Sequence, residues 1–192
     1  MSYGYITAVD AGVLEAVLQT FKGRPVRFVE LGTYQGGTAV GVRDFCAAQN
    51  SPLEYWAVDA SAYCGPGPFP GCHYIIGKTD EVSDRVPNEC DMILVDACHC
   101  LTHVVLDAVN YGSKVKPGGY MLFHDTAPDV QDVQTNTWVH QDKPVYRTNV
   151  LEAFKFLGWP NARWELFKQD YDPTALLGGR RYGGMAAFRK TI

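Results

Sequence analysis

The sequence predicts an α/β fold with a doubly wound, mostly parallel sheet, because short apolar runs alternate with helix-like segments along the chain. The apolar runs are continuous and bounded by turn-forming residues, which is typical of strands buried on both faces. We expect seven strands, at residues 26–31, 55–59, 73–76, 91–96, 120–125, 163–168 and 184–189. The last two lie close in sequence, so the sheet is expected to end in an antiparallel strand.

Helical segments are expected at 1–20, 36–48, 79–86, 101–115 and 148–157. Thr79 is the expected N-cap of the third segment, since threonine accepts hydrogen bonds from a first helical turn. One apolar face of the fourth segment is formed by Leu101, Val104, Val105, Ala108 and Val109. Asp107 lies off that face, and we expect its side chain to be solvated. The Lys-Pro-Gly-Gly-Tyr stretch at 116–120 is expected to end the helix and begin the next strand.

Composition limits the classes of function. The chain has 192 residues, 46% of them hydrophobic, and a net charge of −4, which fits one domain over 1–192 and argues against nucleic acid as a partner. No long apolar run predicts a membrane span, and the N-terminus lacks a basic signal-like region. We therefore expect a cytoplasmic protein with reduced cysteines. The spacing Cys98-x-Cys100 is tighter than that of the usual zinc knuckle.

The stretch FVELGTYQGGTAV, residues 28–40, joins a predicted strand to a predicted helix through a glycine-rich turn. It lacks the Lys-Ser/Thr pair of a phosphate-binding loop, and its glycine spacing differs from the dinucleotide fingerprint G-x-G-x-x-G. Such a turn lets a ligand approach the backbone closely. Glu30 at the end of the strand favours a cationic ligand over a pyrophosphate, because a carboxylate repels phosphate.

S-adenosylmethionine has the required character, since it carries an ammonium, a sulfonium and a ribose diol but no phosphate. The diol requires an acid at the end of the next strand, and Asp59 stands in that place. The alternative is a glycine-rich turn beside an aspartate that only caps backbone groups. Because the turn, the strand-end acid and the second acid agree, we predict S-adenosylmethionine as the cofactor.

Two segments resemble known enzymes. VELGTYQGGTA resembles the first motif of class I methyltransferases. Residues 91–126 are similar to the corresponding segment of the catechol and caffeoyl-CoA type O-methyltransferases and of the macrocin and cephalosporin-hydroxylase-like group. The resemblance implies a Rossmann-like fold. The cofactor-binding residues that the turn and the resemblance together indicate are Glu30, Gly32, Thr33, Tyr34, Gly36, Gly37, Thr38, Asp59, Ala60, Thr79, Asp80 and Asp96.

In that family, acids ending the fourth and fifth strands hold a divalent cation that lowers the pKa of the acceptor hydroxyl. The resemblance places the metal ligands at Asp96, His124 and Asp125. His124 departs from the family, in which an acid is usual. Hard cations prefer oxygen ligands, so an imidazole suits Mn²⁺, Fe²⁺ or Zn²⁺ better than Mg²⁺. A reaction without metal remains the alternative.

His99 follows Asp96 by three residues, where related enzymes carry a lysine or histidine base, so Asp96 and His99 are the expected catalytic residues. The alternative is that His99 caps the helix beginning near residue 101. Trp138 and His140 are expected to contact substrate from a loop over 126–147.

The predicted reaction is methyl transfer from S-adenosylmethionine to a hydroxyl of a small molecule such as a sugar or phenol, by a chain that is a monomer or a homodimer. An accessory protein that binds cofactor without turnover and an NAD-dependent oxidoreductase are the alternatives.

Overall fold

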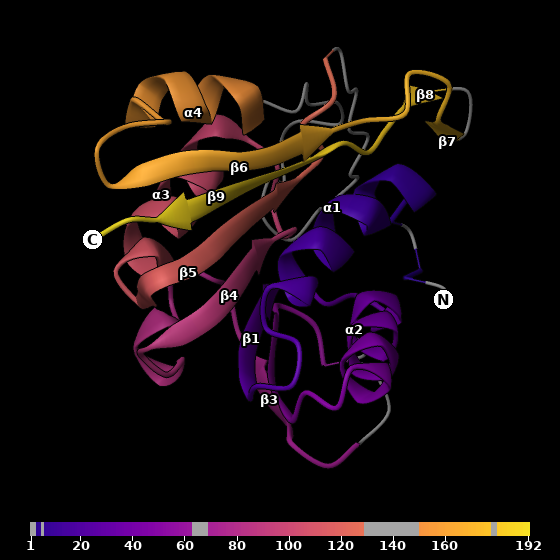
Figure 1. Cartoon of the computed structure of the whole chain (residues 1–192). Coiled ribbons are helices and arrows are strands. Elements are labelled where there is room, and N and C mark those ends of the chain that lie inside the picture. The colour runs from indigo at the N-terminus through magenta and orange to yellow at the C-terminus, as the bar shows by residue number, and fades with distance from the viewer. Residues whose placement is uncertain (1–2, 5, 63–68, 129–149, 178–179) are drawn as a thin grey trace.

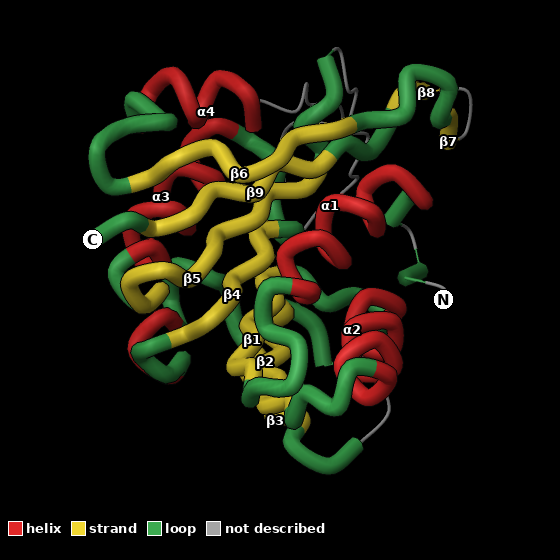
Figure 2. Tube along the Cα trace, viewed as in Figure 1, coloured by secondary structure: helices red, strands yellow, loops and turns green. Residues whose placement is uncertain are grey.

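A computed structural model of the chain describes residues 3–4, 6–62, 69–128, 150–177 and 180–192. Its centre is a seven-stranded sheet with the order β3-β2-β1-β4-β5-β9-β6 (Figures 1 and 2). The first five strands in the chain run parallel, and β9 lies antiparallel between β5 and β6. The predicted doubly wound α/β sheet with an antiparallel last strand is therefore confirmed.

The strands agree with the predicted runs to within a few residues, apart from the start of β5. Their bounds are β1 Val26–Leu31, β2 Leu53–Asp59, β3 Cys72–Ile76, β4 Cys90–Val95, β5 Val115–His124, β6 Trp164–Asp170 and β9 Met185–Lys190. A small separate ribbon is formed by β7 (Leu176–Leu177) and β8 (Arg180–Arg181). Each residue of β4 is buried, because β4 lies in the middle of the sheet with helices over both faces.

Helices cover both faces of the sheet (Figure 1). On one face lie α1 (Ala8–Gln19) and α2 (Gly37–Ala48), and on the other lie α3 (Leu101–Gly112) and α4 (Val150–Leu157). Each face has its own buried apolar cluster, one around Phe28 and Leu14, the other around Phe123 and Phe188. The two layers of helix hold the central strands so that only their ends reach solvent.

The prediction of a helix over residues 79–86 is wrong. Only a single 3₁₀ turn, η1 (Ser83–Arg85), forms there, and Val86 after it is extended. Pro87 follows, and the residue before a proline is disfavoured in helical conformation. Thr79 is consequently not an N-cap. The prediction that residues 116–120 end a helix and begin a strand is also wrong, because this stretch lies inside β5, which begins at Val115. The pairing of β4 with β5 shifts register between Cys90 and Met92.

The buried face of α3 differs from the predicted one. It consists of Val104, Asp107, Ala108 and Tyr111, whereas Val109 is 60% exposed. The helix is thus rotated by about one residue relative to the apolar pattern, because Tyr111 packs inward as well. The expectation that Asp107 is solvated is wrong, since its side chain is fully buried.

The strand order reverses between β1 and β4, which is where ligands bind in doubly wound sheets. The turns after these two strands touch. Gly32, at φ 90°, packs so closely that a Cβ atom there would overlap the carbonyl oxygen of Asp96. The Asp96 amide also donates to the carbonyl of Leu31 at 2.9 Å. Glycine is required at this position for space as well as for backbone conformation.

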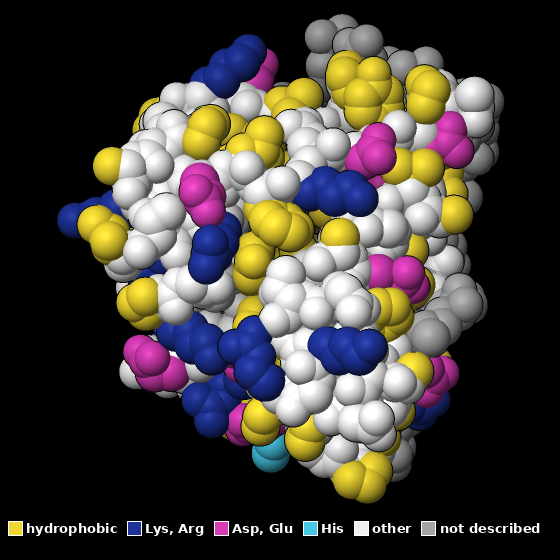
Figure 3. Space-filling model, viewed as in Figure 1, with side chains coloured by type: hydrophobic (Ala, Val, Ile, Leu, Met, Phe, Trp, Pro, Cys, Tyr) yellow, Lys and Arg dark blue, Asp and Glu magenta, His cyan; other side chains and the backbone are white. Residues whose placement is uncertain are grey.

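Within the described part of the chain, no helix is both long and apolar enough to span a bilayer. On the face shown in Figure 3, hydrophobic side chains are scattered among charged ones. Most of the predicted substrate loop, with Trp138 and His140, falls at 129–149 and lies outside the described residues.

Candidate active site

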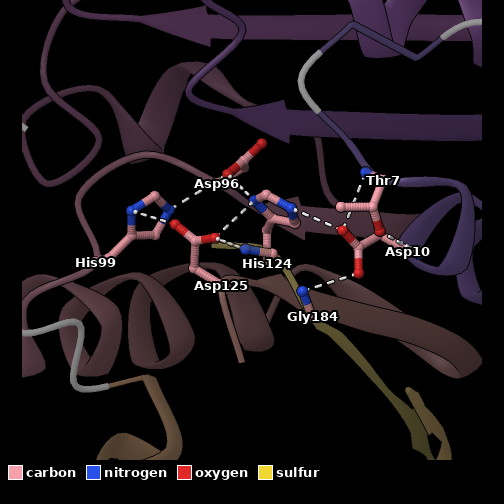
Figure 4. A network of polar contacts seen from close by, with 8 residues as sticks. Thr7, Asp10, Asp96, His99, His124, Asp125 and Gly184 are labelled. Carbon is pink, nitrogen blue, oxygen red and sulfur yellow. Dashed lines mark hydrogen bonds and ion pairs between the residues drawn. The ribbon is translucent and has the colours of Figure 1, made fainter. Parts of the chain in front are cut away.

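Five side chains form an alternating row of carboxylates and imidazoles at the carboxyl ends of β4 and β5 (Figure 4). His99 lies between two acids, with its Nε2 3.2 Å from Asp96 Oδ1 and its Nδ1 3.2 Å from Asp125 Oδ2. His124 lies between two acids as well, with its Nδ1 2.9 Å from Asp96 Oδ1 and its Nε2 3.4 Å from Asp10 Oδ2. The row therefore runs Asp125–His99–Asp96–His124–Asp10.

The strands deliver these residues to one place. Asp96 directly follows β4, and His124 is the last residue of β5. Asp125 has a φ of 56°, a conformation that few non-glycine residues adopt, and its Oδ1 accepts a hydrogen bond from the Gly183 amide at 2.8 Å. This turn directs both His124 and Asp125 into the site, although consecutive residues of a regular strand would face opposite sides.

His99 does not cap α3. The N-cap of that helix is Cys100, whose side chain makes no capping bond. The imidazole of His99 instead contacts the two carboxylates. The structure thus places His99 where the catalytic interpretation requires a polar group, and the capping alternative is wrong.

Asp10 also belongs to the site, a role that the sequence analysis did not predict. It is fully buried and accepts hydrogen bonds from the Gly184 amide at 2.8 Å and the Thr7 amide at 3.1 Å. The spacing Thr7-x-x-Asp10 forms a capping box at the start of α1, and this signal is readable in the sequence. The contact between Asp10 and His124 cannot be read from the sequence, because 114 positions separate the two residues.

The row contains opposite charges. Burial by itself lowers the pKa of His124, but Asp96, Asp125 and Asp10 together raise it well above its usual value. Burial likewise raises the pKa of Asp96, yet His124 and His99 outweigh it and hold this pKa well below its usual range. At neutral pH the pair is therefore an imidazolium and a carboxylate. With three acids to two imidazoles, the site suits a cationic ligand.

Asp59 connects the ends of β1 and β2. Its Oδ2 accepts a hydrogen bond from the Tyr34 amide at 2.8 Å, and its Oδ1 accepts one from the Ser61 amide at 2.9 Å. The carboxylate is partly exposed at the edge of the sheet. Both of its oxygens thus bind backbone amides, as the capping alternative expects, and its contact with a ribose diol stays a prediction.

Comparison with known proteins identifies the family. A family profile described as "Methyltransferase domain" matches residues 29–126, just over half of the chain. The chain belongs to this methyltransferase family. No protein with curated annotation matches the sequence.

Solved structures with the same fold are distant in sequence. An rRNA methylase from Streptococcus thermophilus has a TM-score of 0.60 at 8% identity, over 95% of this chain and 97% of its own. The N-methyltransferase NodS from Bradyrhizobium japonicum WM9 has a TM-score of 0.60 at 12% identity, over 95% and 97%.

The MycE methyltransferase of the mycinamycin biosynthetic pathway, solved with Mg, SAH and mycinamycin VI, has a TM-score of 0.61 at 15% identity, over 98% of this chain. The chain spans about half the length of MycE. At these identities the three structures establish the fold only.

Gly36 and Gly37 of the glycine turn are required for different structural reasons in this methyltransferase. Gly36, at φ 75°, is the N-cap of α2 and closes the turn. Gly37 faces the N-terminal segment, where an added Cβ would lie 2.5 Å from the Cα of Gly4. The first glycine thus shapes the turn, and the second permits the N-terminal segment to pack on α2.

The other predicted cofactor residues surround this turn unevenly. Thr33 and Thr38 are buried, Tyr34 is 51% exposed, and Ala60 and Asp80 are exposed. Thr79 is partly buried, and its carbonyl accepts a hydrogen bond from the Tyr111 hydroxyl at 2.7 Å. Their roles toward a cofactor remain predictions.

Glu30 occupies a different environment from the expected one. It lies beneath the turn with 1% exposure, and the Tyr55 hydroxyl donates to its Oε2 at 2.6 Å. Burial raises the pKa of Glu30 to about 8, although the bond from Tyr55 opposes this. The side chain is therefore mostly protonated at neutral pH. The expectation for Glu30 rests on a charged carboxylate, whereas burial favours its neutral form, and Asp96 is the nearby acid whose charged form is favoured.

Two of the three predicted metal ligands, Asp96 and His124, belong to the group of ligand atoms that converge. The ligand atoms of Asp96, His99 and His124 all lie within 4.8 Å of one another. Asp125, predicted in place of His99, contacts both imidazoles, His99 at 3.2 Å and His124 at 3.6 Å. The strand-end residues thus meet as expected, and His99 from the following loop joins them.

Replacing Glu30 tests its buried, neutral state. The folded pKa near 8 lies above the unfolded value of 4.5, so folding retains a proton that the unfolded chain releases. Rising pH should therefore favour unfolding of the wild type, by about 1.4 kcal/mol per pH unit between about pH 5 and 8, relative to Glu30→Gln. Urea unfolding at both pH values measures this. Parallel pH profiles would contradict it, and exposed Glu165→Gln should give such a parallel profile.

Proposed function

We propose that this chain is an S-adenosylmethionine-dependent methyltransferase that O-methylates a hydroxyl of a small molecule, a sugar or a phenol. The observation that carries the proposal is the His99 imidazole held between two carboxylates at the edge where β4 and β5 end. The family assignment supports methyl transfer, and the position of the row beside the Gly32 turn supports a donor bound next to His99. The specific kinship to catechol or caffeoyl-CoA type enzymes is part of this proposal.

Donor binding is assigned to the glycine turn, Asp59 and Asp96. The Asp59 carboxylate accepts the ribose hydroxyls, and the turn gives the ligand access to backbone. Asp96 offers its negative charge to the ammonium and sulfonium end. MycE was solved with SAH, which supports a cofactor of this type on the same fold.

When bound, S-adenosylmethionine supplies an electrophilic methyl group on its sulfonium. A neutral His99 would keep one ring N–H on a carboxylate, and its other nitrogen, once the acceptor hydroxyl displaced the second carboxylate contact, would take the proton of that hydroxyl. Asp125 and Asp96 orient the imidazole and stabilise the imidazolium that forms. The protein otherwise acts by holding both reactants in line.

A divalent cation would be held by Asp96, His99 and His124, whose donor set suits Mn²⁺, Fe²⁺ or Zn²⁺ better than Mg²⁺. Such an ion would polarise the acceptor oxygen. In the structure, however, each ring nitrogen of both histidines already faces a carboxylate, so the histidines have partners without an ion. We therefore assign proton transfer to His99 itself.

Asp59→Ala tests donor binding. Hydrogen bonds to charged groups contribute about 1.5–3 kcal/mol, so the Kd for S-adenosylmethionine should rise roughly tenfold to a hundredfold. Calorimetry with folded protein measures the change, and the exposed Glu165→Ala should bind as the wild type does. Equal affinity of Asp59→Ala and wild type would show that the diol is held elsewhere.

His99→Gln tests the base. A general base typically accelerates its step by about 10²–10⁴-fold, so kcat in a screen of sugar and phenol acceptors should fall by that order. The Kd for S-adenosylmethionine should stay unchanged, since His99 faces the acceptor. The matched control is His73→Gln, which replaces an exposed histidine of β3 that stacks on Trp56 of β2. Cofactor binding without turnover in the wild type would instead favour the accessory-protein alternative.

Chelation separates the base from the metal mechanism. We expect methyl transfer to survive EDTA, because each ring nitrogen of His99 and His124 already faces a carboxylate without an ion. Turnover and cofactor affinity are measured before and after dialysis against the chelator. Loss of turnover that Mn²⁺ restores would make His99 a ligand and would refute its role as base.

A further inference from the structure

A second cluster of ligand-type side chains lies in the same loop and takes no part in the proposed reaction. Among the described residues, the ligand atoms of Cys98, Cys100 and His103 all lie within 4.8 Å of one another. The Nδ1 of His103 is 2.9 Å from the Sγ of Cys100. All three side chains are partly exposed, so an ion from solvent has access to them.

Local structure explains how the side chains of Cys98 and Cys100, only two positions apart, meet that of His103. Cys100 is the N-cap of α3, and His103 lies three positions later, in the first turn above it. Cys98 belongs to the loop before the helix, which turns back so that its sulfur joins the other two. The helix supplies the third ligand, which is why Cys98-x-Cys100 can form a cluster although it is tighter than a zinc knuckle.

Asp107 provides an independent observation. It lies one turn beyond His103 in α3, is fully buried, and neither of its carboxylate oxygens has a hydrogen-bond partner among the described residues. Thr79 lies near enough to favour the charged form, but its geometry is not that of a hydrogen bond. A carboxylate buried without compensation is costly, so this position requires a nearby positive charge or a proton.

The position of Asp107 connects it with the cluster. It lies one helical turn from His103 on α3, but it is not among the side chains whose ligand atoms lie within 4.8 Å of one another, so it is a neighbour of the three ligands and not a fourth ligand. A bound cation would supply the missing compensation and keep the group ionised.

We propose that Cys98, Cys100 and His103 bind a thiophilic divalent cation of the Zn²⁺ type, with the carboxylate of Asp107 completing its surroundings. Thiolate sulfur and imidazole nitrogen are the ligands that Zn²⁺ prefers, and the three that converge here leave one position of its usual tetrahedral site for water. The site differs from Asp96, His99 and His124, whose donors are oxygen and nitrogen without sulfur.

The ion would hold the loop that carries His99. His99 stands between the two cysteines in sequence, and its ring contacts Asp96 and Asp125 while Cys100 contacts His103. The two sets of side chains therefore face different neighbours from one short segment. Metal binding here is structural and does not depend on the proposed methyl transfer.

Cobalt absorption tests the site directly on the full chain. Co²⁺ added to reduced, metal-stripped wild type should give a sulfur-to-cobalt charge-transfer band in the near ultraviolet and the intense visible bands of a tetrahedral ion. One equivalent of Zn²⁺ should bleach both. A Co²⁺ spectrum without the thiolate band would overturn the proposal, whatever any variant shows, and no methyl donor enters the measurement.

Variants locate the ligands. The double variant Cys98→Ser/Cys100→Ser should lose the thiolate band, whereas Cys72→Ser, a partly exposed cysteine of β3, should keep it. His124→Asn should also keep it, because it removes only the other cluster. Asp107→Asn, which preserves shape, should weaken Zn²⁺ affinity by about 10–100-fold. An unchanged band in a folded double variant, or an unchanged affinity in Asp107→Asn, would refute the corresponding assignment.

Discussion

The candidate active site depends on one carboxylate oxygen, Asp96 Oδ1, because ring nitrogens of both His99 and His124 contact it. The residue is placed there by two constraints on backbone. Its carbonyl is packed against Gly32, and its amide is bonded to Leu31, so the turns after β1 and β4 form one unit. Buried opposite charges of this kind contribute little net stability, yet loss of one partner leaves the other uncompensated. The row thus fixes the relative positions of α1, β4 and β5.

The loop from Asp96 to the start of α3 carries two kinds of chemistry. Cys98 and Cys100 of this loop lie with His103, and His99 lies with the acids at the strand ends. The first group is rich in sulfur and partly exposed, and the second is rich in oxygen and buried. This separation of soft from hard ligands within five residues allows the two clusters to differ in what they bind.

Much of the fold was predictable from local pattern, because buried parallel strands are continuous apolar runs and their order follows from strand–helix alternation. The exceptions have local causes that the pattern did not weigh. Only one 3₁₀ turn forms within 79–86, where Pro87 disfavours a helical Val86, and in α3 Tyr111 packs inward together with Asp107. Asp96, His124 and Asp125 were predictable as neighbours, since strands 4 and 5 were expected side by side. Their pairing with His99 was not.

The sequence by itself determined the sheet, the family and the strand-end positions of Asp59, Asp96 and His124, because these depend on the order of residues along single elements. Only the tertiary structure decided which of the acids carries charge. Glu30 is beneath the turn and holds a proton, whereas Asp96 meets two imidazoles and stays ionised. It also decided that Asp10 of α1 belongs to the site. Burial and contacts between distant segments set these properties, and neither is encoded in local spacing.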